Sequence, residues 1–230
     1  MEGEKLKDVS SLPLKGVGGS GCGGSSLPLK GGGGSGTVAI LALQGAFAEH
    51  EQMLQRLGAE TMLIRNLEDW HSFLPLKGVG GSWSGLGGAL VIPGGESTAM
   101  MRIMKDEGLF DPIREAIFGG LPVLGTCAGL ILLDRNHLGV MDILARRNAY
   151  GRQLGSFNAE EAFSGIGKVP MTFIRAPYIE EAGPDVEILA TVEGRAVAAR
   201  QRNMLVTAFH PELTDDTRIH ELFLSYIRVG

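Results

Sequence analysis

The chain has 230 residues, which is enough for one α/β domain with a full hydrophobic core. Its formal net charge is −5 and no lysine/arginine cluster stands out, so composition argues against a nucleic-acid partner or an anionic membrane. No apolar run approaches transmembrane length, and the charged first ten residues lack the apolar core of a signal peptide. Two cysteines, Cys22 and Cys127, make no disulfide framework. We therefore expect a cytoplasmic protein.

A short repeated segment interrupts the sequence. Leu-Pro-Leu-Lys-Gly occurs twice in the first 36 residues and once inside the chain, each time followed by a Gly/Ser tract. The copies are too short and irregularly spaced for a stacked repeat, and they cannot bury enough apolar surface to offset their ordering entropy. We expect residues 1–36 to be a disordered extension, 37–230 to be the folded domain, and about 71–85 to be a flexible insert. Cys22 lies in the extension and is expected to be chemically inert.

From residue 37, short apolar runs alternate with helical patterns. The runs at 38–43, 61–65, 89–92 and 121–124 predict strands. The segments between them predict three helices: one ending near Gly58, one containing Met100 and Met104, and one over 112–118. This alternation predicts an α/β domain of three layers, in which a mostly parallel central sheet is covered by helices on both faces.

Strands dominate the part of the chain that follows. Further strands are expected at 140–146, 169–175, 186–191, 196–200 and 204–209. A last amphipathic helix is expected over 219–227, with Asp215 and Asp216 in its first turn.

The segment Gly125-Thr126-Cys127-Ala128-Gly129 lies between a predicted strand and a predicted helix. A cysteine at such a sharp turn, with glycine two residues on either side, is the cysteine form of a nucleophile elbow. The glycines allow close backbone approach, and the amides at the helix start can bind a developing oxyanion. A small buried thiol in a core turn is the alternative interpretation. The elbow alone does not decide between them.

His210-Pro211-Glu212 directly follows the predicted strand at 204–209. Pro211 favours an extended backbone at His210, and strand alternation would then place His210 and Glu212 on one side. A carboxylate there can orient one imidazole nitrogen while the other faces a thiol. Together with the elbow, this motif predicts a cysteine-nucleophile acyl transferase or hydrolase.

The predicted site lies at the carboxyl edge of the parallel sheet. Gln44, Gly94-Gly95, Cys127 and His210 each follow a strand directly, and ligand crevices in such sheets lie at this edge. The Gly94-Gly95 amides suit an oxyanion loop, whose donor would join the amide of Ala128. A simple helix-opening turn capped by Ser97 can occur at the same place.

Six segments carry a family resemblance. In order, they are Leu-Ala-Leu-Gln-Gly at 41–45, Pro-Gly-Gly-Glu-Ser-Thr at 93–98, the elbow at 125–129, Arg-Asn-Ala-Tyr-Gly-Arg-Gln at 147–153, Phe-Ile-Arg-Ala-Pro at 173–177, and Phe-His-Pro-Glu-Leu-Thr at 209–214. The chain resembles the glutaminase subunits of the ribose 5-phosphate-dependent pyridoxal 5′-phosphate synthases, a family of triad (class I) glutamine amidotransferases. The resemblance implies their flavodoxin-like, class I amidotransferase fold.

The resemblance also implies an activity and a set of roles. L-Glutamine would be hydrolysed to L-glutamate, and the ammonia would pass to a partner synthase subunit that makes pyridoxal 5′-phosphate. Neither a cofactor nor a metal is implied. The implied catalytic residues are the nucleophile Cys127, the general base and acid His210, and the orienting Glu212. The implied glutamine-binding residues are Gly95, Glu96, Ser97, Arg147, Ile174 and Arg175, and the implied oxyanion donors are Gly95 and Ala128.

Two other functions stay open at this stage. One is a different cysteine hydrolase on a similar sheet, such as a γ-glutamyl hydrolase or a deglycase-like protein. The other is a regulatory subunit that the extension and the insert have made catalytically silent.

Overall fold

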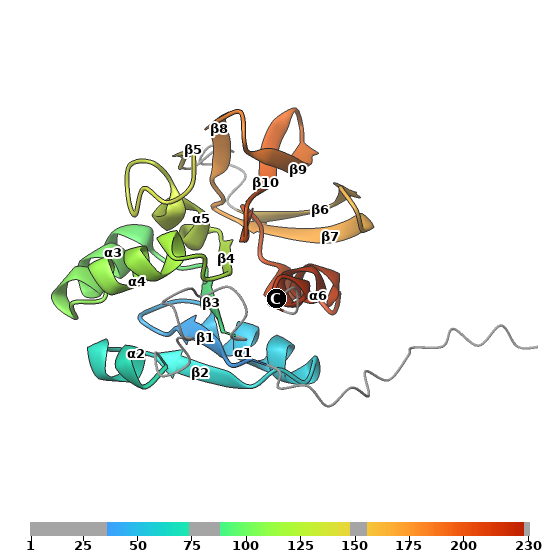
Figure 1. Ribbon diagram of the computed structural model, residues 1–230. Helices are drawn as coiled ribbons and strands as arrows, with labels where there is room; N and C mark the ends of the chain where they lie inside the picture. The colour runs from blue at the N-terminus through green and yellow to red at the C-terminus, as the bar shows by residue number, and fades with distance from the viewer. Residues whose placement is uncertain (1–35, 74–87, 148–155, 228–230) are drawn as a thin grey trace, which may run out of the picture. The chain divides into compact units, whose positions relative to one another are not determined.

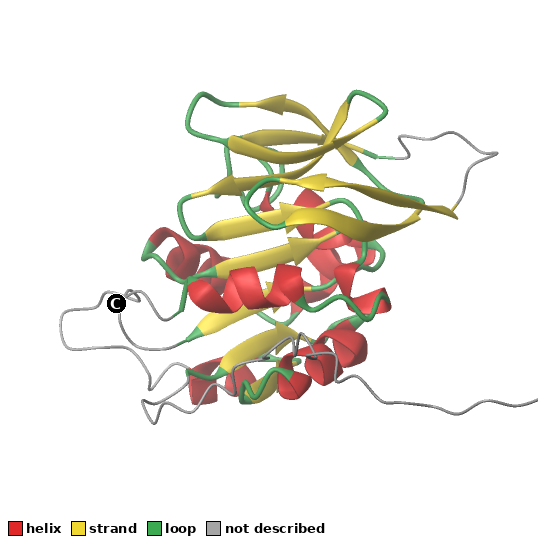
Figure 2. Ribbon diagram, turned by 90° about the vertical axis from the view of Figure 1, so that its right-hand side faces the viewer, coloured by secondary structure: helices red, strands yellow, loops and turns green. Residues whose placement is uncertain are grey.

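Five short apolar runs form the parallel half of the central sheet, in the order β2-β1-β3-β4-β11. Figure 2 shows the strands lying side by side with helices next to them. The computed structural model describes residues 36–73, 88–147 and 156–227. Every residue of β1, β3, β4 and β11 is buried, as expected for strands covered on both faces. The five strands are β1 (Val38–Leu41), β2 (Thr61–Ile64), β3 (Ala89–Ile92), β4 (Val123–Thr126) and β11 (Met204–Thr207).

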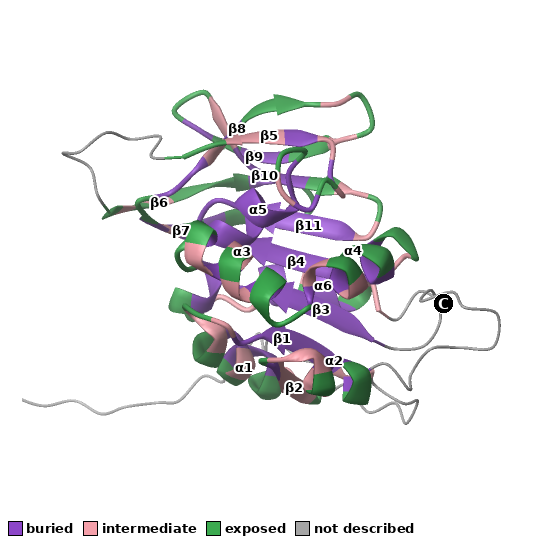
Figure 3. Cartoon of the chain, turned by 90° about the vertical axis from the view of Figure 1, so that its left-hand side faces the viewer, coloured by how far each residue is buried: buried purple, intermediate pink, exposed green. Residues whose placement is uncertain are grey.

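Helices cover both faces of these strands. Figure 1 shows α3 (Ser97–Asp106) and α4 (Phe110–Phe118) on one side, and α1 (Phe47–Arg56) and α6 (Arg218–Ser225) on the other. The short α5 (Ala128–Leu133) follows β4 and is buried throughout. Each longer helix turns an apolar stripe to the sheet and a charged face outward, which Figure 3 shows as a buried layer under exposed helix surfaces. The expected three-layer α/β domain with a mostly parallel central sheet is confirmed.

The helix α2 (Leu67–Phe73) was not expected and corrects one boundary. Trp70 and Phe73 are its buried residues, and they pack 5.5 Å apart, centroid to centroid, in the core under β2. Residues 71–73 therefore belong to the folded domain and not to the insert expected at 71–85. Residues 74–85 of that insert, and residues 1–35 of the expected extension, lie outside the described residues.

The sheet continues beyond β11 in the antiparallel sense. The order β11-β10-β8-β5 extends it, and β9 pairs with β10 as well. The sequence predicted β5, β9 and β10 and missed β8, which follows Pro177 directly. The four strands beyond β11 are β5 (Ile143–Arg146), β8 (Tyr178–Ala182), β9 (Glu187–Val192) and β10 (Arg195–Gln201).

A separate two-stranded sheet lies beside the cleft described below. It pairs β6 (Ser156–Phe163) with β7 (Gly167–Ile174) along their whole lengths. The sequence predicted β7 but missed β6, whose polar residues leave most of the strand exposed. Phe173 connects this hairpin to the core, since its ring lies 5.7 Å from that of Phe209. The Arg218 guanidinium binds the carbonyl oxygens of Ile166 and Lys168 and fixes the other end.

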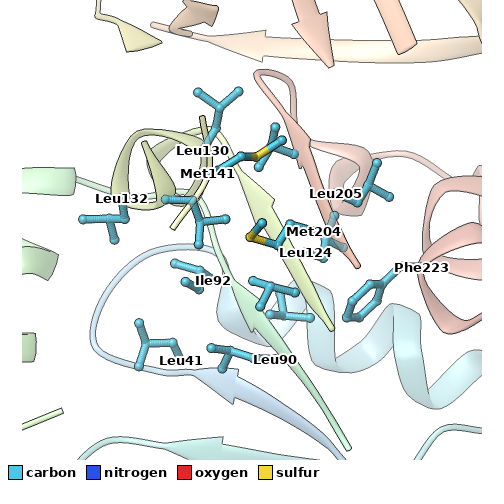
Figure 4. Packing of buried hydrophobic residues seen from close by; sticks show 14 of the residues in the cluster. Leu41, Leu90, Ile92, Leu124, Leu130, Leu132, Met141, Met204, Leu205 and Phe223 are labelled. Atoms are coloured by element: carbon cyan, nitrogen blue, oxygen red, sulfur yellow. The ribbon is translucent and has the colours of Figure 1, made fainter. Parts of the chain in front are cut away.

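The core is continuous from β2 to β10 and is dominated by aliphatic residues. Figure 4 shows Leu90, Ile92, Leu124 and Leu205 from neighbouring strands, with Phe223 of α6 packed against them. Met100 and Met104 of α3 are buried in this core, as their helical spacing predicts, while Met101 is only partly buried. Among the described residues, no helix has the length and apolarity needed to cross a membrane.

Candidate active site

Cys127 sits in a sharp turn between β4 and α5. Its backbone adopts φ 48° and ψ −97°, a conformation that side-chain-bearing residues rarely take. The two glycines of the motif make this turn possible. A Cβ on Gly129 would lie 2.0 Å from the Ile92 carbonyl oxygen, and one on Gly125 would lie 2.9 Å from the Gly129 carbonyl carbon. Both contacts are with backbone, so no side-chain movement can relieve them.

The turn fixes the cysteine against two neighbouring elements. The Cys127 amide donates to the Thr207 carbonyl oxygen of β11 at 2.8 Å. The sulfur lies 3.9 Å from the Ile174 carbonyl oxygen at the end of β7, and only 8% of the residue is exposed. The nucleophile expected from the sequence is thus presented at the floor of a cleft between the main sheet and the hairpin.

The histidine and glutamate lie together as expected, but by a different backbone route. Pro211 begins a short 3₁₀ helix, η2 (Pro211–Leu213), so strand alternation does not continue past His210. The tight turn nevertheless brings the Glu212 carboxylate back to the ring. Nδ1 of His210 lies 2.7 Å from Oε1 of Glu212, and both side chains are buried. His210 lines the same cleft as Cys127, close enough for the thiol to affect its pKa.

These contacts decide the charge of His210. Burial alone would lower its pKa, but the neighbouring Cys127 thiol and Glu212 carboxylate raise it to about 10. Burial would raise the pKa of the Glu212 carboxyl, but the neighbouring imidazoles of His50 and His210 hold it below its usual value. His210, paired with Glu212, can therefore hold a proton taken from the Cys127 thiol, which is the property that a general base needs.

Two further histidines lie behind Glu212, and sequence analysis gave neither of them a role. His50 on α1 contacts His220 on α6 at 3.0 Å between Nδ1 and Nε2, and both residues are fully buried. Burial lowers the pKa of His50, and it lowers that of His220 to about 3, so both rings are neutral near pH 7. The apolar spacing of α1 carried no signal of this contact, which depends on how two distant helices pack.

The glycine loop after β3 packs directly on His210. A Cβ on Gly94 would lie 2.2 Å from Cε1 of His210, so only glycine fits there. The Gly94 carbonyl oxygen accepts a hydrogen bond from the Ala46 amide at 3.0 Å. Because a peptide unit is planar and trans, the N–H of Gly95 points away from Ala46.

The helix cap after this loop differs from the expected one. Glu96, and not Ser97, caps α3, since its carboxylate accepts from the amides of Thr98 and Ala99. The Glu96 amide in turn donates to Oε1 of Gln44 at 2.9 Å, which joins the loops after β1 and β3. A carboxylate suits this position because it accepts two amides that the helix leaves unpaired and complements the helix dipole.

One cleft of about 600 Å³ contains the residues singled out from the sequence. Arg147 also donates from Nη1 to the Thr98 hydroxyl at 3.0 Å, which holds its guanidinium over the start of α3. Arg175 has a positive φ of 44°, at the sharp bend after β7. The expected residues that line the cleft are Gly95, Glu96, Ser97, Cys127, Ala128, Arg147, Ile174, Arg175 and His210.

Glu212 lies just behind that lining, in contact with His210. Within the described ranges, no group of three or more histidine, cysteine, aspartate or glutamate side chains is arranged to hold a metal ion. Of the segment at 147–153, only Arg147 belongs to the described residues.

Residues 40–228 match the SNO glutamine amidotransferase family. The chain belongs to this family. Its curated relatives include two pyridoxal 5′-phosphate synthase subunits PdxT from Streptococcus pneumoniae. The one from strain CGSP14 is 54% identical over 194 residues, which is 81% of this chain and 95% of the relative. The one from strain ATCC 700669 is 53% identical over 195 residues, which is 82% of this chain and 96% of the relative.

Solved structures agree with SNO-family membership. A crystal structure of a glutamine amidotransferase has a TM-score of 0.73 at 38% identity and covers 84% of this chain and all of its own. A glutamine amidotransferase from Thermotoga maritima has a TM-score of 0.53 at 14% identity, covering 86% of this chain and 87% of its own, and shows the shared fold alone. The expected family and the expected class I amidotransferase fold are confirmed.

Proposed function

We propose that this chain hydrolyses L-glutamine to L-glutamate and ammonia, and supplies the ammonia to a partner synthase subunit that makes pyridoxal 5′-phosphate. Membership of the SNO family supports the reaction, and the PdxT relatives at 53–54% identity support the pathway and the partner. The observation that carries the proposal is geometric. A thiol at a strained elbow and an imidazole line the same cleft, and a carboxylate lies 2.7 Å from that imidazole, just behind the lining.

The site residues can perform the reaction in two acyl-transfer steps. The sulfur of Cys127 attacks the side-chain amide carbon of glutamine while His210 takes the thiol proton. His210 then gives this proton to the leaving nitrogen, so ammonia departs and a γ-glutamyl thioester remains. A water, deprotonated by His210, attacks the thioester, and the proton returns to the sulfur as glutamate leaves. Glu212 keeps the imidazole in the required tautomer and stabilises its charged form.

Backbone amides at the elbow would stabilise the intermediates of both steps. The amide of Ala128, at the start of α5, and that of Gly95 are the proposed donors to the tetrahedral oxyanion. The proposed substrate-binding residues surround this point on three elements. Gly95, Glu96 and Ser97 lie on the loop after β3, Arg147 follows β5, and Ile174 and Arg175 lie at the end of β7. An arginine suits the α-carboxylate because its planar fork binds a carboxylate bidentately.

The first test is labelling of Cys127 by an electrophilic glutamine analogue, followed by a substrate panel. Glutamine-protected labelling and turnover of glutamine, but not of γ-glutamyl peptides, are expected for a glutaminase. Preference for γ-glutamyl peptides would identify a γ-glutamyl hydrolase, and absence of labelling would identify a silenced subunit. Cell fractionation tests the cytoplasmic location that we propose for the chain.

The second test concerns the partner. Glutamine hydrolysis without an ammonia acceptor wastes substrate, so we expect the isolated chain to be slow. Adding the synthase subunit should raise kcat more than it lowers KM, which is the pattern expected when a transition-state donor such as the Gly95 amide is completed. Full-speed glutamate release by the chain alone, unchanged when the partner is titrated in, would refute the two-component assignment.

A further inference from the structure

The buried histidine pair contacts the catalytic carboxylate from behind. Nε2 of His50 lies 3.3 Å from Oε2 of Glu212 and 3.0 Å from the Thr126 hydroxyl oxygen. Its other ring nitrogen, Nδ1, lies 3.0 Å from Nε2 of His220. The strand that leads into the elbow, the helix α1, the helix α6 and the turn η2 therefore each place one polar side chain in a single buried cluster.

The two oxygens of Glu212 have different surroundings. Oε1 lies 2.7 Å from Nδ1 of His210 and accepts a hydrogen bond from it. Oε2 makes no ordinary hydrogen bond among the described residues, and Nε2 of His50 lies 3.3 Å from it. A buried carboxylate oxygen without any donor costs free energy, and that cost falls when an N–H points at it. At 3.3 Å from Oε2, Nε2 of His50 lies outside ordinary hydrogen-bond geometry but close enough to lower this cost.

The hydrogen-bond chain fixes the tautomer of both rings. If His50 carries its proton on Nε2, it donates toward Glu212 and Thr126, and His220 donates from Nε2 to Nδ1 of His50. His220 is then left with a bare Nδ1, the ring atom that has no hydrogen-bond partner within the described part of the chain. The opposite arrangement would bury an unpaired N–H on His220 and turn a lone pair of His50 toward a carboxylate. Both of these features are unfavourable, so the first arrangement holds.

We propose that His50 is a positioning residue for glutamine hydrolysis: its Nε2–H holds the Glu212 carboxylate ionised and turned toward His210, and His220 fixes the tautomer that supplies this proton. The inference rests on the proposed function for its kinetic consequences. His50 does not touch substrate, and it acts on the reaction through Glu212 and His210.

The pH dependence follows from the groups around His50. Glu212 and His210 face it from η2 and the residue before it, His220 faces it from α6, and Glu49 is on its own helix. Removing the His50 donor raises the pKa of the Glu212 carboxyl, because its charged form loses a favourable contact. A carboxylate held less firmly also stabilises the imidazolium less, which lowers the pKa of His210. Because the reaction needs Glu212 ionised, the acid limb that reports ionisation of Glu212 moves to higher pH.

Two amide substitutions separate positioning from packing. In His50→Gln, the side-chain amide nitrogen reaches the position of Nε2 and still donates to Glu212. In His50→Asn, it reaches only the position of Nδ1, so Glu212 loses its donor. Leu54→Ala is the matched control for lost stability, because Leu54 lies one turn along the same buried face of α1 and is fully buried.

The experiment measures glutamate release by the full chain with the synthase subunit, across pH. We expect His50→Asn to lower kcat about tenfold or more with KM within twofold, and to move the acid limb upward. His50→Gln should keep the parent profile, and Leu54→Ala should lower Tm without moving the limb. A His50→Asn enzyme with the parent kcat and limb, or a His50→Gln enzyme as impaired as His50→Asn, would overturn the proposal.

A second measurement does not depend on turnover. The NMR titration of the His210 ring in the full chain alone should show a lower pKa in His50→Asn than in the parent, and the parent value in His50→Gln. If His50→Asn does not fold, His220→Leu provides the same test, since it removes the donor that fixes the His50 tautomer. Unchanged titration in the folded variant refutes the positioning role. If the parent does not hydrolyse glutamine but the pKa of His210 still falls in His50→Asn, then the glutaminase assignment is refuted and this inference is not.

Discussion

The substitution Gly94→Ala tests how closely the glycine loop packs on His210, the proposed general base. The added Cβ would lie 2.2 Å from Cε1 and 2.9 Å from Nδ1 of His210, while ordinary contact begins at 3.4 Å. The loop carbonyl is held by the Ala46 amide, so the imidazole is the part that must move, by about 1.2 Å. Such a shift breaks its 2.7 Å contact with Glu212.

The expected loss follows from this displacement. A misplacement of about 1 Å at a reacting group costs about 100-fold in rate, which is about 2.7 kcal/mol of activation free energy. Glutamate release by the chain with its synthase partner measures kcat and KM, and thermal unfolding monitors the fold. We expect the loss in kcat, with Tm changed by only a few degrees.

Gly88→Ala is the matched control at the other end of β3. Its Cβ would meet the tip of the Phe73 ring at 3.2 Å, a contact that a small ring movement relieves, and it lies at the edge opposite the cleft. This variant should keep the parent kcat. If Gly94→Ala retains kcat within about threefold of the parent at unchanged Tm, then the loop does not position His210.

Three further outcomes are expected. Cys127→Ser should remove glutaminase activity by several orders of magnitude while Cys22→Ser changes nothing, and residual turnover above about a hundredth of the parent rate would contradict the nucleophile assignment. A chain starting near Val38, with a short loop in place of residues 74–87, should keep its kcat and KM, because both changes enter strands at their amino ends; a well-folded but inactive trimmed chain would show that the repeats have a role. Acid should destabilise the fold through His220: with a pKa of about 3 when folded and about 6.5 when unfolded, the unfolded state binds the extra proton, so stability is full above pH 6.5 and falls as pH drops toward 3. At pH 5 this amounts to about 2 kcal/mol, so urea titrations at pH 7 and 5 should show a smaller acid loss in His220→Leu than in the parent, and equal losses would contradict it.

The predictions that succeeded from sequence rest on backbone requirements. The elbow could be predicted because the glycines at 125 and 129 have a purely steric purpose, which the structure shows as close contacts with backbone at both positions. The parallel strands could be predicted because unbroken apolar runs have few other solutions. The contact between His210 and Glu212 was predicted correctly, although a 3₁₀ turn and not strand alternation produces it.

The failures have a shared physical cause. The strand β6 is mostly exposed, so no alternation of apolar and polar residues identified it. The end of α2 was assigned to the insert because Phe73 is buried partly by residues beyond that insert, such as Gly88, which lies beside its ring. The role of His50 was invisible for the same reason, since it depends on the packing of α1 beside α6, 170 residues away. Local pattern does not encode contacts of this kind.

One backbone hydrogen bond connects the hairpin β6–β7 to His210. The His210 amide donates to the Thr172 carbonyl oxygen at 2.8 Å, and Ile174 lies two residues further along the same strand. A ligand that orders the end of this strand therefore orders the backbone of His210 as well. If the proposed roles of Ile174 and His210 hold, substitutions along the hairpin should change affinity and turnover together.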